Sequence, residues 1–372
     1  MAKVNILKYE VNASQGNLQQ TLDAIKNDRI ARSIKKIQAS MEEVEIPYYL
    51  LKEEIKQEQR SIYHAMRDML LKLLPEESNR SQTALIVGTS LVDWHLVDAI
   101  NATVYDEKKP YTSQKQSIDS YAKELSKEFG LNDFTMTINT ACTSSANALL
   151  EASNMINIGL FEYAIVIGVE IFSPIMSSGF YAMDLIANNI VKPFDIDRDG
   201  LILGEALAGI VLGKDDTKWS LEGGFSNCHS QTITSVSQSG DECVEVMQKA
   251  LQNCDVEAKE ITALKAHATG SHSNDLAELN AISKVFEPSL TFTALKPYVG
   301  HTIGASGVLE IALLMAAVDE GFIPKTYFCE KPILPEYRPI SEHKKCDRGL
   351  FMCNYFGFGG NNISLIIKKE LS

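Results

Sequence analysis

Apolar and polar side chains follow two different periods along this chain. Residues 134–138 alternate with a period of two, and we interpret this run as a buried strand. From Thr143 to Ile158, small and apolar residues recur at helical spacing, and Gly159 stands where helices often end in a glycine. The pattern therefore predicts a strand that passes through a short turn into a helix.

The same two periods organise other parts of the chain. Apolar residues between 57 and 74 fall on one helical face, Pro75 ends that helix, and residues 81–88 form a predicted buried strand. A further helix is expected over about residues 304–318. Residues 27–58 carry charges of both signs, and we interpret them as a solvated face, with a partner-binding surface as the alternative.

Two stretches of the sequence resemble each other. Residues 204–214 and 359–369 both pass from a glycine turn into an apolar strand and end in lysine. Each would close one half of the molecule, so we predict an α/β chain of two similar halves, residues 1–213 and 214–372. Each half would contribute βαβ units and a sheet that is covered by helices on both faces.

Composition narrows the class of protein. The chain has 372 residues, of which 45% are hydrophobic and 22% charged, as expected for a globular protein with two lobes. A net charge of −13 predicts no nucleic-acid or membrane partner. Seven cysteines without a C-x-x-C spacing indicate free thiols, so we expect a cytoplasmic protein. We expect no signal peptide and no membrane span, because the apolar runs are too short.

Cys142 lies at the predicted turn between strand and helix. The partial positive charge of a helix N-terminus favours a thiolate, which is the nucleophilic form of cysteine. The alternative is an inert cysteine packed in the turn, and this segment alone does not separate the two interpretations.

Two histidines lie where predicted strands give way to loops. His267 follows a short apolar run, and His301 lies in a glycine-rich loop that opens the helix near residue 304. Open α/β sheets keep their chemistry at such strand ends. A single histidine there is more often structural, but two of them with a helix-start cysteine favour nucleophilic acyl transfer.

Together these motifs resemble the elongating β-ketoacyl-acyl carrier protein synthases, which are ketosynthases of the thiolase superfamily. The matching segments occur in the family's order: 140–145, 193–200, 204–206, 267–278, 296–310 and 354–361. The resemblance covers roughly residues 80–370 and implies the thiolase fold, with duplicated βαβ-rich halves in a layered αβαβα arrangement. The family's usual opening, a glycine-rich strand and turn, is not recognisable in residues 1–20.

The resemblance implies a decarboxylative Claisen condensation. Cys142 would take an acyl group from a phosphopantetheine arm, and His267 and His301 would polarise the thioester of a malonyl unit through Nε2. The backbone N–H groups of Cys142 and Phe358 would form the oxyanion hole. The product would be a β-ketoacyl carrier protein in fatty acid, polyketide or polyene elongation, with no metal and no further cofactor.

Other matching positions have supporting roles. Lys296 and Glu310 correspond to a buried ion pair beside the second histidine, with a loop-capping role for Lys296 as the alternative. The positions that match contacts to the pantetheine arm or acyl chain are Thr269, Ser271, Phe358 and Gly359. Candidates for lining an acyl tunnel, or else ordinary core residues, are Phe172, Met176, Phe180, Tyr181 and Met183.

Several acidic residues and one departure from the family pattern also carry expectations. Glu205 is expected to hold the fold and take no part in the chemistry. Asp275 and Glu278 are expected to cap and charge the start of a helix. Ala268 stands where the family usually has glycine, which predicts an altered turn after His267.

The resemblance also implies partners. These are an acyl carrier protein and a second subunit, either in a homodimer or in a heterodimer with a related ketosynthase-like chain. The divergent sequence suggests a specialised pathway such as aryl polyene biosynthesis. Two alternatives are a malonyl decarboxylase or acyltransferase of the same fold, and a non-catalytic chain-length partner, which retention of Cys142, His267 and His301 argues against.

Overall fold

The computed structural model describes residues 3–39, 42–52, 55, 59–91, 119–229 and 237–371. The strands in these ranges are β1 (Val4–Ala13), β2 (Gly16–Asn17), β3 (Ser33–Ala39), β4 (Glu42–Tyr48), β5 (Thr83–Gly88), β6 (Thr135–Ile138), β7 (Tyr163–Glu170), β8 (Ala206–Gly213), β9 (Trp219–Cys228), β10 (Ile261–Lys265), β11 (Phe292–Thr293), β12 (Phe322–Ile323), β13 (Lys344–Lys345), β14 (Gly349–Phe356) and β15 (Asn361–Lys369).

The helices that the structure describes lie between these strands. The α-helices are α1 (Leu18–Lys26), α2 (Gln59–Leu73), α4 (Asp119–Phe129), α5 (Ser144–Asn157), α6 (Pro174–Ala182), α7 (Asp241–Asn253), α8 (His272–Val285), α9 (Lys296–Val299) and α10 (Ser306–Asp319). The short 3-10 turns are η1 (Glu77–Gln82), η2 (Ala141–Thr143), η3 (Ala258–Glu260), η4 (Ile303–Ala305) and η5 (Phe358–Gly360).

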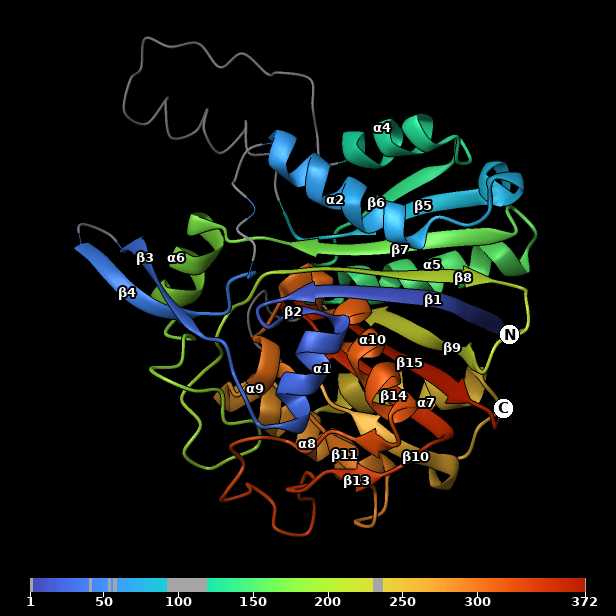
Figure 1. The fold of residues 1–372 in the computed structure, drawn as a ribbon. Coiled ribbons are helices and arrows are strands. Elements are labelled where there is room, and N and C mark those ends of the chain that lie inside the picture. Colours follow the sequence, from blue (N-terminus) through green and yellow to red (C-terminus); the bar gives the residue numbers. More distant parts are fainter. Residues whose placement is uncertain are drawn as a thin grey trace.

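The central sheet repeats one strand order. One end runs β6-β5-β7-β8-β1 and the other β11-β10-β14-β15-β9, and β1 meets β9 in the middle. In both runs the first two pairings are parallel and the last two antiparallel. Figure 1 shows the N-terminal strands above the C-terminal ones. The sheet is continuous where we expected one sheet for each half, because Val4 and Asn5 pair with Leu221 and Ser220. The division at residue 213 stays a prediction.

Helices form three layers around these strands, which confirms the predicted αβαβα arrangement. In β7, Ile165 and Ile167 face α2 and α4, whereas Ala164 and Val166 face α5 and α10. Strand β14 likewise turns alternate side chains toward α5 and α10 and toward α7 and α8. Helices α5 and α10 therefore fill the space between the two runs of strands.

A close crossing of α5 and α10 determines where the chemistry lies. A Cβ atom on Gly307 would lie 2.2 Å from the backbone nitrogen of Ala146, so this contact requires glycine. The crossing brings the N-terminal ends of the two central helices together. Cys142 precedes α5 and His301 precedes α10, so the two residues meet at the same place.

The N-terminal segment corrects one expectation. Residues 4–13 form β1, a strand in the middle of the sheet, and Gly16 follows it in a turn with a φ of 117°. The strand and turn that we did not recognise in residues 1–20 are therefore present. We did not recognise the strand in the sequence because the polar residues Lys8 and Glu10 interrupt its apolar pattern.

Two further expectations changed with the tertiary structure. β6 is half-buried along its length and not fully buried, because it is the last strand of the sheet in the described part of the chain. Residues 33–39 and 42–48, expected on a solvated face, pair as the antiparallel strands β3 and β4, whose first residues are exposed, whereas Ile46–Tyr48 at the end of β4 are buried. No helix among the described residues has the length and apolar character needed to traverse a membrane.

Candidate active site

Cys142 is held in a rigid turn between β6 and α5. Ala141 adopts a left-handed φ of 54°, which turns the chain sharply from the strand into η2. The Ser144 hydroxyl donates to the Ala141 carbonyl at 2.6 Å and accepts from the Thr140 N–H at 3.0 Å. Cys142 itself is only 4% exposed, so its sulfur faces the interior of the protein.

Residues of the N-terminal half hold His301. Its backbone N–H donates to the Ile202 carbonyl at 2.7 Å, and its carbonyl accepts from the Gly204 N–H at 3.0 Å. The imidazole Nε2 lies 3.1 Å from the Cys142 sulfur. The other ring nitrogen, Nδ1, lies 3.3 Å from the Ser306 hydroxyl, a contact that we did not foresee.

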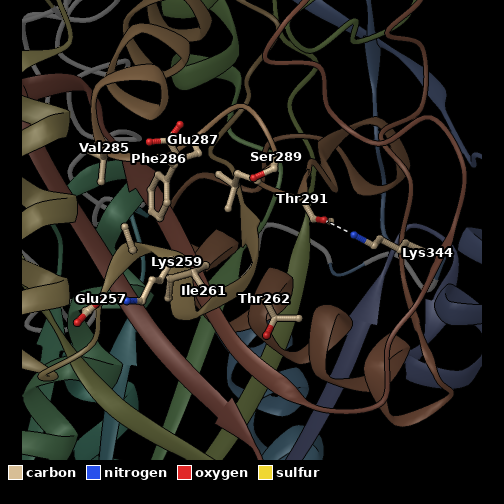
Figure 2. Close-up of a pocket in the computed structure, with 12 residues that line it drawn as sticks. Glu257, Lys259, Ile261, Thr262, Val285, Phe286, Glu287, Ser289, Thr291 and Lys344 are labelled. Atoms are coloured by element: carbon tan, nitrogen blue, oxygen red, sulfur yellow. Dashed lines mark hydrogen bonds and ion pairs between the residues drawn. The ribbon is translucent and has the colours of Figure 1, made fainter.

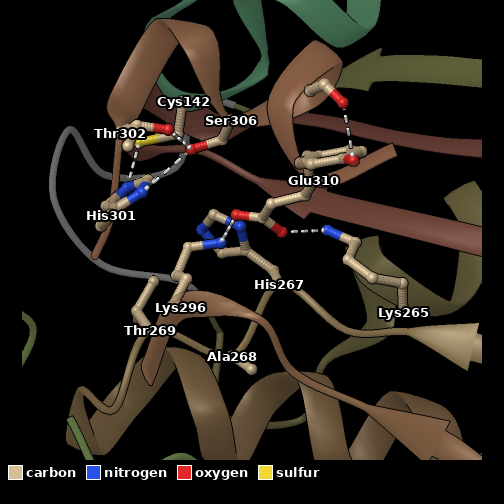
Figure 3. A network of polar contacts seen from close by, with 12 residues as sticks. Cys142, Lys265, His267, Ala268, Thr269, Lys296, His301, Thr302, Ser306 and Glu310 are labelled. Atoms are coloured by element: carbon tan, nitrogen blue, oxygen red, sulfur yellow. Dashed lines mark hydrogen bonds and ion pairs between the residues drawn. The ribbon is translucent and has the colours of Figure 1, made fainter. Parts of the chain in front are cut away.

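His267 completes the group from the end of β10. Its ring lies 5.3 Å from the ring of His301, nearly perpendicular to it. The Cys142 sulfur and one nitrogen of each imidazole all lie within 4.8 Å of one another (Figure 3). Both His267 ring nitrogens lack a hydrogen-bond partner among the described residues, although the side chain is buried. Its ring nitrogens are therefore available to a substrate.

The turn after His267 is held by a carboxylate and is strained. Glu278 accepts from the backbone N–H groups of His267 and Ala268, each at 2.8 Å. Ala268 has a φ of 50°, so it occupies a conformation that suits the glycine usual in the family. Asp275 accepts from the Phe194 and Gly270 N–H groups. Glu278 and Asp275 thus tie loops together, and neither is the N-cap of α8, contrary to our expectation. Asp275 does place a carboxylate in the first turn of α8, as expected.

A buried ionic cluster lies behind the histidines. Lys296 Nζ is 2.7 Å from one oxygen of Glu310, as the resemblance implied, and Lys265 Nζ is 2.7 Å from the other. We did not predict a role for Lys265 from the sequence. The sequence feature that could have indicated one is a lysine at the end of an apolar strand, two residues before His267 and therefore on the same side of the strand.

Burial sets the protonation of the reactive groups. It raises the pKa of the Cys142 thiol to about 11, although the N–H groups of Phe358 and Cys142 and the charge of Lys296 lower it. This corrects our expectation that the helix terminus would favour a thiolate. Burial and the nearby Lys296 hold the pKa values of His267 and His301 well below the usual range, so both imidazoles are neutral near pH 7.

These protonation states predict how Cys142 reacts with iodoacetamide. A thiol with a pKa of about 11 gains thiolate as pH rises, so alkylation should accelerate steadily from about pH 6 to about pH 10. Mass spectrometry of the Cys142 peptide measures this rate without interference from other cysteines. A rate that levels off from about pH 6 upward would indicate a thiolate–imidazolium pair and contradict the prediction.

Cys142 belongs to a cluster of buried apolar side chains. Phe358 stacks on Phe180 with ring centroids 5.6 Å apart, and both lie in one cluster with Cys142. Phe172 and Met176 are partly buried against the same cluster. The remaining two lining candidates, Tyr181 and Met183, are each 41% exposed and lie outside it. Gly359, next to Phe358, has a φ of 82°.

The two hydroxyls expected to meet a pantetheine arm lie next to each other. Thr269 and Ser271 are buried, with their oxygens 3.0 Å apart. Ser271 also borders a cavity of about 260 Å³ whose walls include Arg198 and His272. Glu205 accepts from the N–H groups of Leu51 and Phe172, which agrees with its expected role in holding the fold.

The group formed by Cys142, His267 and His301 could in principle hold a metal ion. Cysteine sulfur and imidazole nitrogen are also zinc ligands, but the buried Lys296 that depresses both histidine pKa values would repel a divalent cation.

A separate pocket of about 490 Å³ lies beside η3 and the end of α8, with Phe286, Thr291 and Lys344 in its wall (Figure 2). It holds none of the predicted site residues.

Comparisons with known proteins identify the family. Residues 53–218 match the model of the β-ketoacyl synthase N-terminal domain, and residues 220–330 match that of the C-terminal domain. The 3-oxoacyl-acyl-carrier-protein synthase 2 of Vibrio harveyi is 24% identical over 319 residues, which are 79% of this chain and 77% of that protein. The mitochondrial 3-oxoacyl-acyl-carrier-protein synthase of Arabidopsis thaliana is 27% identical over 333 residues, 81% of this chain and 71% of that protein.

Solved structures share the fold along the whole chain. A chain from the complex of the ketosynthase ApeO with its chain length factor ApeC, from Xenorhabdus doucetiae, has a TM-score of 0.85 at 20% identity and covers 99% of this chain and 98% of its own. The β-ketoacyl synthase of Burkholderia phymatum STM815 has a TM-score of 0.85 at 20% identity, with both chains fully covered. These likenesses confirm the predicted thiolase-type fold.

Proposed function

Because this chain belongs to the β-ketoacyl synthase family, we propose that it condenses an acyl group on Cys142 with a malonyl unit on an acyl carrier protein. The observation that carries the proposal is the convergence of one buried thiol and two neutral imidazoles within 4.8 Å. Both substrates would arrive on a phosphopantetheine arm, past Thr269 and Ser271. We propose no metal and no other cofactor.

In the first step Cys142 takes over the acyl group. His301 Nε2, at 3.1 Å from the sulfur, accepts the thiol proton as the sulfur attacks the thioester carbonyl. The backbone N–H groups of Cys142 and Phe358, which both lower the pKa of this thiol, would receive the negative charge on the carbonyl oxygen. His301 returns this proton to the pantetheine sulfur as the thioester C–S bond breaks, so the pantetheine thiol leaves and the acyl group remains on Cys142.

In the second step a malonyl thioester loses carbon dioxide. The bond between its methylene carbon and its carboxylate breaks, and the electron pair moves to the thioester oxygen. The Nε2–H groups of His267 and His301 would stabilise it, with His301 now in the tautomer whose Nδ1 accepts from the Ser306 hydroxyl at 3.3 Å. The resulting enolate attacks the acyl carbon on Cys142 and forms the new carbon–carbon bond. The Cys142 thiolate leaves, takes up a proton, and the β-ketoacyl product remains on the carrier.

Intact mass spectrometry tests this function against its two alternatives. The purified chain is incubated with an acyl carrier protein, a malonyl carrier protein, or both. Condensation predicts an acylated chain and a β-ketoacyl carrier. Carbon dioxide loss or acyl exchange without condensation would favour a decarboxylase or acyltransferase, and no mass change in any mixture would favour a non-catalytic chain-length subunit.

The unpaired side of β6 supports a second subunit. β6 is half-buried and ends the sheet in the described part of the chain; Met136 and Ile138 within it, and Phe134 just before it, pack against the core. An exposed edge strand invites pairing with another chain. We propose that a second copy, or a related ketosynthase-like chain, covers it. Membership of a specialised pathway, such as aryl polyene assembly, and a cytoplasmic location stay predictions.

Sedimentation velocity measures this assembly directly. We expect the chain alone to sediment as a dimer at micromolar concentration, because an uncovered sheet edge would be prone to aggregation. If it is a monomer alone, a mixture with a related ketosynthase-like chain should give a heterodimer. A monodisperse monomer under both conditions would contradict the proposed interface.

A further inference from the structure

Lys265 is a buried lysine that the proposed reaction has not used. Its side chain has no exposed surface, and its Nζ lies 2.7 Å from Glu310 and 2.8 Å from the Asn354 carbonyl. The same nitrogen lies 3.5 Å from the centroid of the Tyr355 ring. A carboxylate, a carbonyl and an aromatic face stabilise an ammonium ion, and here they oppose the burial that lowers the pKa of Lys265.

One carboxylate here faces two ammonium groups. Glu310 bonds Lys296 through one oxygen and Lys265 through the other, and all three side chains are buried (Figure 3). The cluster therefore holds one positive charge more than it neutralises. Burial lowers the pKa of Lys265 and the charge of Glu310 opposes this change. An uncompensated charge away from solvent is costly.

The surplus charge acts on the two histidines. Both Lys296 and Lys265 hold the pKa values of His267 and His301 below their usual range. A field that opposes a proton on the imidazoles equally favours negative charge next to them, because screening is weak in the dry interior. Decarboxylation creates such a negative charge, on the thioester oxygen of the enolate.

We propose that Lys265 is a positioning residue for decarboxylation. Together with Lys296 and Glu310 it places a surplus positive charge behind His267 and His301, and this charge stabilises the enolate that the two histidines receive. The inference rests on the proposed function, and it concerns the second step of the reaction. Acylation of Cys142 places its negative charge on the N–H groups of Cys142 and Phe358 and its proton on His301. Removing Lys265 would raise the pKa of His301, which does not weaken it as a proton acceptor, so we expect acylation to be retained.

Lys265→Met tests this role, because methionine preserves most of the volume and removes the charge. Lys369→Met is the matched control: Lys369 bonds Asp319 and the Val318 carbonyl, each at 2.9 Å, and lies 5.8 Å from the Trp219 ring centroid. For Lys265→Met we expect kcat for malonyl decarboxylation to fall at least about tenfold, with KM and the rate of Cys142 acylation within about twofold of the wild type. Lys369→Met should retain wild-type decarboxylation.

The pH profile separates an electrostatic role from a structural one. Removing a positive charge raises a histidine pKa, so the acid limb of the decarboxylation rate should move to higher pH in Lys265→Met. The ionisable groups around His267 are Lys265 on β10, Lys296 on α9, Glu310 on α10, Glu278 on α8, Cys142 on η2 and His301. The other five remain in the variant, so a shift of the limb reports on Lys265.

Three results would overturn the inference. The first is a wild-type decarboxylation rate in Lys265→Met, and the second is an equal loss of acylation and decarboxylation, which indicates a structural role. The third result is a wild-type chain that acylates Cys142 and releases no carbon dioxide. This would refute the proposed function, and the inference about Lys265 depends on that function. If Lys265→Met does not fold, Lys265→Gln is measured with the same criteria.

Discussion

Cys142→Ala is expected to abolish acylation and condensation. The Cys142 sulfur lies next to His301, and the N–H groups of Cys142 and Phe358 lower the pKa of its thiol. Among the described residues no other thiol has these contacts, so we expect none to replace it. Loss of a covalent nucleophile typically reduces turnover by about 10⁴-fold or more. Intact mass spectrometry after incubation with an acyl carrier protein, followed by peptide mapping, measures the labelling.

Another cysteine provides the control for this experiment. Cys228 is exposed, and its sulfur lies 3.7 Å from the Gly359 carbonyl, so it is near the site but makes none of the contacts of Cys142. Cys228→Ala should acquire one acyl group at the wild-type rate. Acyl labelling that persists unchanged in Cys142→Ala would contradict the assignment of the nucleophile.

The two histidine variants should lose decarboxylation but differ in acylation. His267→Ala and His301→Ala each remove one donor to the enolate oxygen, which should slow carbon dioxide release by about 10²- to 10³-fold. Only His301 contacts the Cys142 sulfur, at 3.1 Å, and the thiol pKa is raised to about 11. His301→Ala should therefore also slow acylation, whereas His267→Ala should acylate at nearly the wild-type rate.

Two separate assays measure these steps. Release of carbon dioxide from a malonyl carrier reports decarboxylation, and the mass of the chain after single turnover reports acylation. His343→Ala is a suitable control, because His343 accepts from the Lys325 N–H and has no part in the proposed chemistry. A decarboxylation rate near that of the wild type in either variant would require that histidine to be reassigned as structural.

The sequence by itself determined the local features of the site. A period of two that gives way to helical spacing placed Cys142 between a strand and a helix, and the structure has α5 begin two residues later, at Ser144. Glycine-rich loops after apolar runs placed His267 and His301 at strand ends. These features can be predicted from the sequence because the preferences for strand, turn and helix depend on residues that are neighbours along the chain.

Tertiary structure alone decided the chemical environment of these groups. The thiol pKa is raised because the packed halves exclude water from Cys142, and burial outweighs the helix terminus that the sequence suggested. Lys265 joined the site because Glu310, forty-five positions further along the chain, reaches it across the central layer.

The same distinction explains the other differences. β1 was missed because its burial comes from pairing with β8, roughly two hundred positions away, and not from a continuous apolar run. His301 is held by Ile202 and Gly204 from the other half of the chain. Desolvation, ion pairing and long-range strand pairing depend on which distant segments of the chain come into contact, and a local sequence pattern does not specify those contacts.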